Sequence, residues 1–189
     1  MKKVYVFLAN GFEEIEALTV VDMLRRAKIE TVTVSVEKSK TVVGSHEIPV
    51  IADVKFSETD FSDGSMAVLP GGLAGTNGLK AHKGLAGLLL EYNAKKKMIA
   101  AICAAPSVLG GLGILRERHA TCYPGFENQL TGAVALKDAV VRDGNIITSR
   151  GMGTAIDFSA AIIELLADEE TATELLGKIM YLGRRTIYY

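Results

Sequence analysis

Residues 98–107, Met-Ile-Ala-Ala-Ile-Cys-Ala-Ala-Pro-Ser, form the segment that decides the fold. Its first five residues are continuously apolar, which is typical of a strand covered on both faces of a parallel sheet. The small residues after Cys103 can begin a helix that has Pro106 in its first turn. The segment therefore predicts a strand, then a sharp turn at Cys103, then a helix.

Strands and helices alternate on both sides of this segment. Short apolar or alternating runs predict strands, and apolar residues at helical spacing predict helices. Strands are predicted at residues 4–8, 30–36, 48–52, 66–69 and 98–102, and helices at residues 13–26, 85–92 and 170–181. Phe158, Ile162 and Leu165 mark a further core-facing helix. Asp143-Gly144 predicts a hairpin turn between strands at residues 139–142 and 145–148.

Such alternation predicts an α/β fold, in which helices cover both faces of a mostly parallel sheet. In these sheets, ligands bind beyond the carboxyl ends of the strands. Three segments follow predicted strands in this way, namely residues 10–16, 70–75 and 103–106. We expect the functional site to be built from them.

Composition narrows the class of protein. A length of 189 residues, of which 49% are apolar and 23% charged, predicts a single domain over residues 1–189. The 21 Lys and Arg residues balance 22 Asp and Glu residues, so a primary nucleic-acid role is not expected. No apolar run approaches the about 18 residues that span a bilayer, so no membrane role is expected either. With only Cys103 and Cys122, the chain lacks a disulfide framework, and a reducing cytoplasm is expected.

Cys103 is the candidate nucleophile. A turn from strand to helix would expose its sulfur at the sheet edge and direct the helix N-terminus at it, lowering its pKa below the ~8.5 of a free thiol. Cys122, in a segment predicted as a strand, lacks such a helix. Cys103 as a small buried hydrophobe is the alternative. Pro70-Gly71-Gly72 favours the reactive interpretation, because glycines let backbone N–H groups approach an oxyanion, but these residues also fit a tight turn.

Glu16 is the candidate acid–base residue. Glu13, Glu14 and Glu16 follow the first predicted strand, and the start of a surface helix would contain the same residue types. Glu16, one helical turn from the loop, could point towards the end of the next strand, where its carboxyl group could donate to a thiolate or shuttle a proton. The sequence contains no Ser-His-Asp signature, phosphate loop, dinucleotide motif or metal cluster, and no cofactor is expected. The histidines are expected on the surface: His46, His82 and His119.

Four motifs in order resemble the ThiJ/PfpI superfamily, at residues 8–16, 68–72, 100–106 and 148–154. Within it, the chain is most similar to the branch of the parkinsonism-associated protein deglycase and its bacterial relatives. The resemblance covers nearly the whole chain. It implies a flavodoxin-like three-layer sandwich, a homodimer, and a nucleophile-elbow cysteine at Cys103 beside a protonated Glu16.

The resemblance also implies a function. Members of this branch are described as glyoxalase III or deglycase enzymes acting on methylglyoxal and its early adducts, as oxidative-stress sensors, and as chaperones. It implies that Cys103 attacks a small α-oxoaldehyde while Glu16 shuttles protons, with the N–H groups of Gly71, Gly72 and Ala104 holding the anion or oxyanion. The alternative is a non-enzymatic redox sensor or chaperone, in which Cys103 oxidises to a sulfinate that Glu16 stabilises.

Three positions depart from the family pattern. Ala104 stands where protease-like members have a histidine, so no Cys-His pair forms locally and peptidase activity is not expected. The older name of thiazole monophosphate biosynthesis protein is not expected to describe the activity either. Tyr123 precedes Pro124 where the human member has a histidine, which removes a general base of that kind. His46 stands where the human protein has an arginine contributed by the partner subunit, which predicts a less cationic anion pocket.

Overall fold

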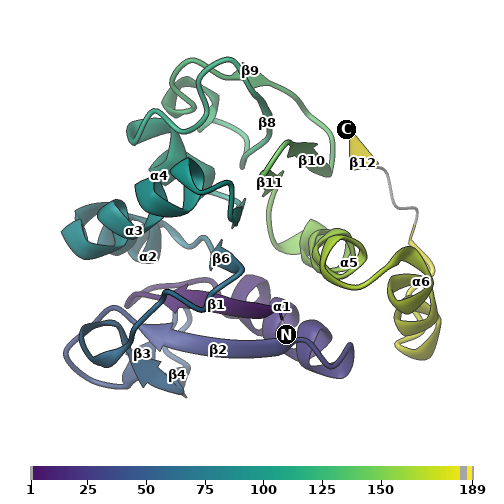
Figure 1. The fold of residues 1–189 in the computed structure, drawn as a ribbon, viewed down its shortest axis with the longest axis horizontal. Helices are drawn as coiled ribbons and strands as arrows, with labels where there is room; N and C mark the ends of the chain where they lie inside the picture. The colour runs from purple at the N-terminus through teal and green to yellow at the C-terminus, as the bar shows by residue number, and fades with distance from the viewer. Residues whose placement is uncertain (1, 184–186, 189) are drawn as a thin grey trace.

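A mostly parallel sheet lies at the centre of the computed structural model, which describes residues 2–183 and 187–188 (Figure 1). Its strand order is β12-β10-β11-β7-β6-β1-β2-β5. Among the described pairs of neighbours, only β10 and β11 run antiparallel. The strands are β1 (Lys3–Leu8), β2 (Glu30–Ser35), β5 (Val54–Lys55), β6 (Met66–Leu69), β7 (Met98–Ile102), β10 (Val140–Asp143), β11 (Ile146–Ser149) and β12 (Ile187–Tyr188).

Helices cover both faces of this sheet, which confirms the predicted α/β fold. Figure 1 shows α2, α3 and α4 gathered on one side, and α5 and α6 on the other. The helix α1 packs against α5. The helices are α1 (Glu14–Arg26), α2 (Leu73–Ala81), α3 (Lys83–Ala94), α4 (Pro106–Gly111), α5 (Ala155–Leu166) and α6 (Glu169–Lys178). None of the helices in the described part of the chain is long and apolar enough to cross a membrane.

The two faces of the sheet have separate apolar cores because successive strand residues point to opposite faces. In β1, Val4 and Val6 pack into the core beneath α1 and α5. Tyr5 and Phe7 pack into the core beneath α2, α3 and α4. A strand buried on both sides is continuously apolar, which is why β1 and β7 could be recognised in the sequence.

Short elements complete the fold. The strands β3 (Thr41–Val43) and β4 (Pro49–Ile51) form a separate hairpin, so the strand predicted at residues 48–52 lies outside the main sheet. The strands β8 (His119–Ala120) and β9 (Val134–Ala135) form another small pair. Cys122 follows β8 in a loop, which corrects its predicted place in a strand. The 3-10 helices are η1 (Phe56–Glu58), η2 (Glu127–Gln129) and η3 (Met152–Thr154).

The helix α2 was not predicted, because it contains two glycines, which disfavour a helix interior. The structure shows why glycine is present. A Cβ atom at Gly75 would lie 2.7 Å from the backbone of Phe12, and one at Gly78 would lie 2.9 Å from Ala9 Cβ. The glycines therefore allow α2 to pack closely against the loop that follows β1.

The sheet also positions the site. In the sheet, β2 lies on one side of β1, and β6 followed by β7 lies on the other side. The order of strands therefore reverses at β1 and β6, where α/β sheets bind their ligands. The segments after β1, β6 and β7 meet at this carboxyl edge.

Candidate active site

Cys103 forms the turn between β7 and α4. Its φ of 65° lies in the left-handed region, which is uncommon for a residue other than glycine. Two backbone hydrogen bonds hold this conformation: Cys103 N–H donates to Ser149 O at 3.0 Å, and Tyr123 N–H donates to Cys103 O at 2.8 Å. The sharp turn predicted from the sequence is therefore present, and the side chain is half-buried.

The carboxyl group of Glu16 lies beside this cysteine. Glu16 is 1% exposed, and its carboxyl group lies close enough to the Cys103 thiol for the two to interact. The N–H group of Gly71 donates to Glu16 Oε2 at 2.8 Å. A Cβ atom at residue 71 would lie 2.6 Å from both Cys103 Cβ and Glu16 Oε2, so glycine is required for the two side chains to meet.

Two backbone N–H groups face the sulfur, those of Gly72 and Ala104. Gly72 has a φ of 83°, and a Cβ atom there would lie 2.3 Å from Gly11 O. Gly71 differs from the prediction, because its N–H is used by the Glu16 carboxylate. The structure therefore places two of the three predicted donors, Gly72 and Ala104, beside Sγ.

Burial dominates the electrostatics of the pair. Burial raises the pKa of Glu16 to about 7, although hydrogen bonds from Cys103 and Gly71 lower it. Burial and the adjacent Glu16 carboxylate raise the pKa of Cys103 to about 12, although the N–H groups of Gly72 and Ala104 lower it. The predicted depression of the thiol pKa is therefore wrong, because desolvation and a neighbouring negative charge outweigh the effect of the helix N-terminus. Glu16, whose pKa lies near neutrality, becomes the group that can accept the thiol proton.

Cys122 differs from Cys103 in solvent exposure rather than in the direction of its thiol pKa shift. It is 2% exposed, and burial raises the pKa of its thiol to about 11. Cys103, in contrast, is half-buried and lines a cavity.

A cavity of about 480 Å³ opens at Cys103. Its walls include the side chains of Leu73, Tyr123, Phe126 and Met152, which are largely apolar, while Glu13 and His46 add charge. His46 is exposed, as predicted, yet it lines this cavity, a position that its isolated place in the sequence did not reveal. Tyr123 stands where the resemblance leads one to expect a histidine, and it contributes a phenol ring to the wall.

A buried carboxylate holds His46 at the cavity. Glu14 Oε1 accepts from His46 N–H at 2.7 Å, and Glu14 Oε2 lies 2.9 Å from His46 Nδ1. Ser45 Oγ also donates to Glu14 Oε2, at 3.0 Å. Burial alone would raise the pKa of Glu14, but these hydrogen bonds lower it to about 2, while Glu14 and Glu13 raise the pKa of His46. The contact joins residues 32 positions apart, so no local motif could reveal it.

In the described residues, one set of side chains has the spacing of metal ligands, and it includes Glu14 and His46. Ligand atoms of Glu13, Glu14 and His46 lie within 4.8 Å of one another. A cation there would replace the hydrogen bonds that Glu14 makes with Ser45 and His46. The acid–base pair of Cys103 and Glu16 is separate from this group and uses none of its ligand atoms.

Comparisons with known proteins agree with this geometry. A family model described as the DJ-1/PfpI family matches residues 2–165. Protein dj-1beta of Drosophila melanogaster is 36% identical over 176 residues, which cover 92% of this chain and 94% of that protein. Protein DJ-1 homolog B of Arabidopsis thaliana is 38% identical over 181 residues, which cover 95% of this chain. The chain spans only 41% of the length of that plant relative.

Solved structures show the same fold. A DJ-1 superfamily protein of Salmonella typhimurium, solved with a cysteine replaced by alanine, matches with a TM-score of 0.93 and 36% identity, covering 97% of this chain and 100% of that one. Toxoplasma gondii DJ-1, solved in an oxidized form, matches with a TM-score of 0.93 and 34% identity over the same shares of the two chains.

Proposed function

Since the chain belongs to the DJ-1/PfpI family, we propose that it is a cofactor-independent glyoxalase III or deglycase-type enzyme that acts on methylglyoxal or its early adducts. The observation that carries the proposal is the buried Glu16 carboxyl group beside the Cys103 thiol, where both residues line one cavity. A carboxyl group whose pKa lies near neutral pH is well matched to general acid–base catalysis.

The first step is attack by sulfur on the aldehyde carbon. Glu16 accepts the thiol proton as the C–S bond forms, so no free thiolate needs to accumulate. The N–H groups of Gly72 and Ala104 then face the oxygen that gains negative charge, which they stabilise by hydrogen bonding.

The later steps move protons within the adduct. Glu16 first gives its proton to the hemithioacetal oxygen. It then takes the proton from the former aldehyde carbon and returns one to the neighbouring carbonyl carbon. The hemithioacetal hydroxyl group passes its proton to the oxygen of that neighbouring carbon, which leaves a 2-hydroxyacyl thioester on Cys103. Water cleaves this thioester and regenerates the thiol. The sum is methylglyoxal plus water giving lactate, with no external oxidant or reductant.

Lactate release by the purified protein tests this function. We expect turnover to be lost in Cys103→Ser and to fall about 10²–10⁴-fold in Glu16→Gln, because the amide cannot exchange a proton. Glu13→Gln is the matched control, since Glu13 is a carboxylate that lines the same cavity. Wild-type turnover in Glu16→Gln, or an equal loss in Glu13→Gln, would show that Glu16 has no acid–base role.

A second candidate function is a redox sensor or chaperone that uses an oxidised Cys103. It is favoured by the half-buried sulfur beside Glu16, whose carboxyl group, when protonated, can donate to a sulfinate oxygen. Selective peroxide oxidation of Cys103, together with no lactate from methylglyoxal, would establish it over the enzyme. Either function starts from a reduced Cys103, and we also propose a cytoplasmic location, where thiols are kept reduced.

A further inference from the structure

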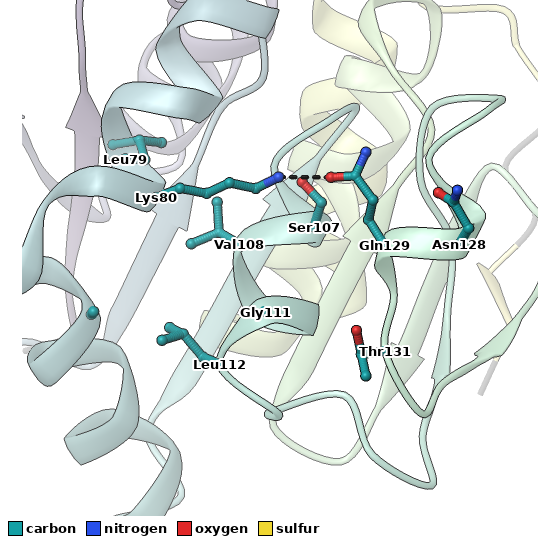
Figure 2. Close-up of a pocket in the computed structure, with 10 residues that line it drawn as sticks. Leu79, Lys80, Ser107, Val108, Gly111, Leu112, Asn128, Gln129 and Thr131 are labelled. Carbon is teal, nitrogen blue, oxygen red and sulfur yellow. Dashed lines mark hydrogen bonds between the residues drawn. The ribbon is translucent and has the colours of Figure 1, made fainter.

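A second cavity, of about 470 Å³, lies between α2, α3, α4 and η2 (Figure 2). It shares no lining residue with the cavity at Cys103. Leu79, Val108 and Leu112 form an apolar floor, of which Leu79 and Val108 are buried. This volume is in the range of small-molecule sites, which combine apolar walls with a few polar groups.

The rim of this groove carries a cation. Figure 2 shows the side chain of Lys80 extending from α2 across the groove towards Ser107 and Gln129. Lys80 Nζ donates to Gln129 Oε1 at 2.8 Å. Asn128 and Thr131 add further polar groups to the same rim.

The positive charge of Lys80 is not matched by a carboxylate. Its hydrogen-bond partner is the neutral amide of Gln129. Within the described residues, no salt bridge joins Lys80 to an acidic side chain. Burial lowers the pKa of Lys80, whereas a nearby carboxylate would raise it. Lys80 itself is an exposed residue, so its ammonium group stands at the rim of the groove, where it can attract an anion to the apolar floor.

The wall that carries Gln129 is held in place by Gly110 of α4. A Cβ atom at residue 110 would lie 2.1 Å from Gln129 O and 2.9 Å from Leu130 Cα. Only glycine therefore allows η2 to approach α4 closely enough for Gln129 to meet Lys80. Ser107 of α4, which also lines the groove, is buried and donates its hydroxyl hydrogen to Ala104 O, which anchors the first turn of α4.

We propose that this groove binds a small organic carboxylate that has a compact apolar body. The carboxylate would accept hydrogen bonds from the Lys80 ammonium and the Gln129 amide NH₂, and the apolar body would cover Leu79, Val108 and Leu112. A hydrogen bond between charged partners gives the site its preference for a carboxylate over a neutral amide of the same shape.

Titration with benzoate, followed by protein NMR, tests the proposal. We expect saturable shifts of the Leu79, Val108 and Leu112 signals. Binding should weaken about tenfold or more in Lys80→Gln, since a charged hydrogen bond is lost. Lys83→Gln is the control, because Lys83 is exposed near the start of α3 and does not line the groove. Benzamide, which has the same ring but no charge, should bind more weakly than benzoate by a similar factor.

Four outcomes would overturn the proposal: no saturable binding, equal binding to Lys80→Gln, equal binding of benzamide, or shifts confined to the cavity at Cys103. The proposal does not depend on the enzymatic function. Benzoate binding should persist in Cys103→Ser, so a protein that makes no lactate could still confirm the groove.

Discussion

At the scale of single residues, Cys103 and Glu16 are two neighbouring acids that shift each other's pKa in a poorly solvated site. The Glu16 carboxylate is one cause of the high pKa of the thiol. Replacing it by a neutral amide removes that repulsion. The same change removes the proton acceptor, so thiol reactivity and aldehyde turnover should respond in opposite directions.

We therefore predict that Glu16→Gln increases the rate at which iodoacetamide labels Cys103 near neutral pH, because the pKa of the thiol falls towards its ordinary value. Site-resolved mass spectrometry at several pH values measures this rate. Cys122, which is buried, should label slowly in both proteins, and Glu13→Gln should behave as wild type. Slower labelling of Cys103 in Glu16→Gln would mean that Glu16 stabilises a thiolate instead.

The pair of Glu14 and His46 predicts a window of pH-dependent stability. The pKa of Glu14 is lowered from 4.5 to about 2, so its contribution is present above pH 4.5 and is lost as the pH falls towards 2. The pKa of His46 is raised above 6.5, so its contribution is present below pH 6.5 and is lost as the pH rises through the raised value.

We thus expect Glu14→Gln to reduce the free energy of unfolding most between pH 4.5 and 6.5, where both groups are charged in the folded protein. Denaturant unfolding at a series of pH values measures the difference. Glu47→Gln, a change at an exposed residue of the same loop, serves as the control. A difference that does not vary with pH would contradict the ion pair.

At the scale of elements, the turn between β6 and α2 sets the geometry of the sulfur. Gly72 combines a φ of 83° with a backbone contact that leaves no room for a side chain. We predict that Gly72→Ala lowers the free energy of unfolding by about 1–3 kcal/mol and reduces turnover, because its N–H moves away from Sγ. Thermal unfolding and lactate assays check both effects.

Gly87→Ala in α3 is the matched control for that change. A Cβ atom at residue 87 would meet nothing within 4 Å, and the residue lies inside a helix. The same substitution should therefore stabilise the protein by about 0.4–1 kcal/mol. Equal effects at the two glycines would contradict the role given to the turn.

At the scale of the whole molecule, exposed apolar side chains point to a second subunit. In the sequence, the apolar residues of α1 extend around more of the helix than one sheet-facing stripe requires, namely Ile15, Leu18, Val21 and Met23. The structure buries Val21 and Met23 within the chain but leaves Ile15 49% and Leu18 37% exposed. Val43, Ile48 and Ile51 of the β3–β4 hairpin are also exposed, and the loop of that hairpin contacts α1 through Glu14.

We predict a two-fold dimer that buries this surface. Light scattering at micromolar concentration should give twice the 20.2 kDa mass of the chain, and Leu18→Lys should shift it towards the monomer. Leu90→Lys, at an exposed position of α3, should leave the dimer intact. A wild-type mass near 20.2 kDa would rule the dimer out.

The sequence by itself determined the α/β order of elements, the turn at Cys103 and the hairpin at Asp143-Gly144. These follow from local periodicity and turn residues, which act over a few neighbouring positions. The helix α2 could not be predicted from local periodicity, because its glycines are required for close packing against a loop that is distant in the sequence. The residues by themselves left the placement of Glu16 open, and the resemblance to the family implied its position beside Cys103.

Only the tertiary structure decided the electrostatics of the site. Three features of the site depend on residues that are far apart in the sequence. They are the direction of the Cys103 pKa shift, the hydrogen bond from Gly71 N–H to Glu16, and the contact of Glu14 with His46. Desolvation and charge interactions act through space, so the same local sequence around a cysteine is compatible with a raised or a lowered pKa of its thiol. Which one holds depends on how deeply the fold buries the groups and which charges it places beside them.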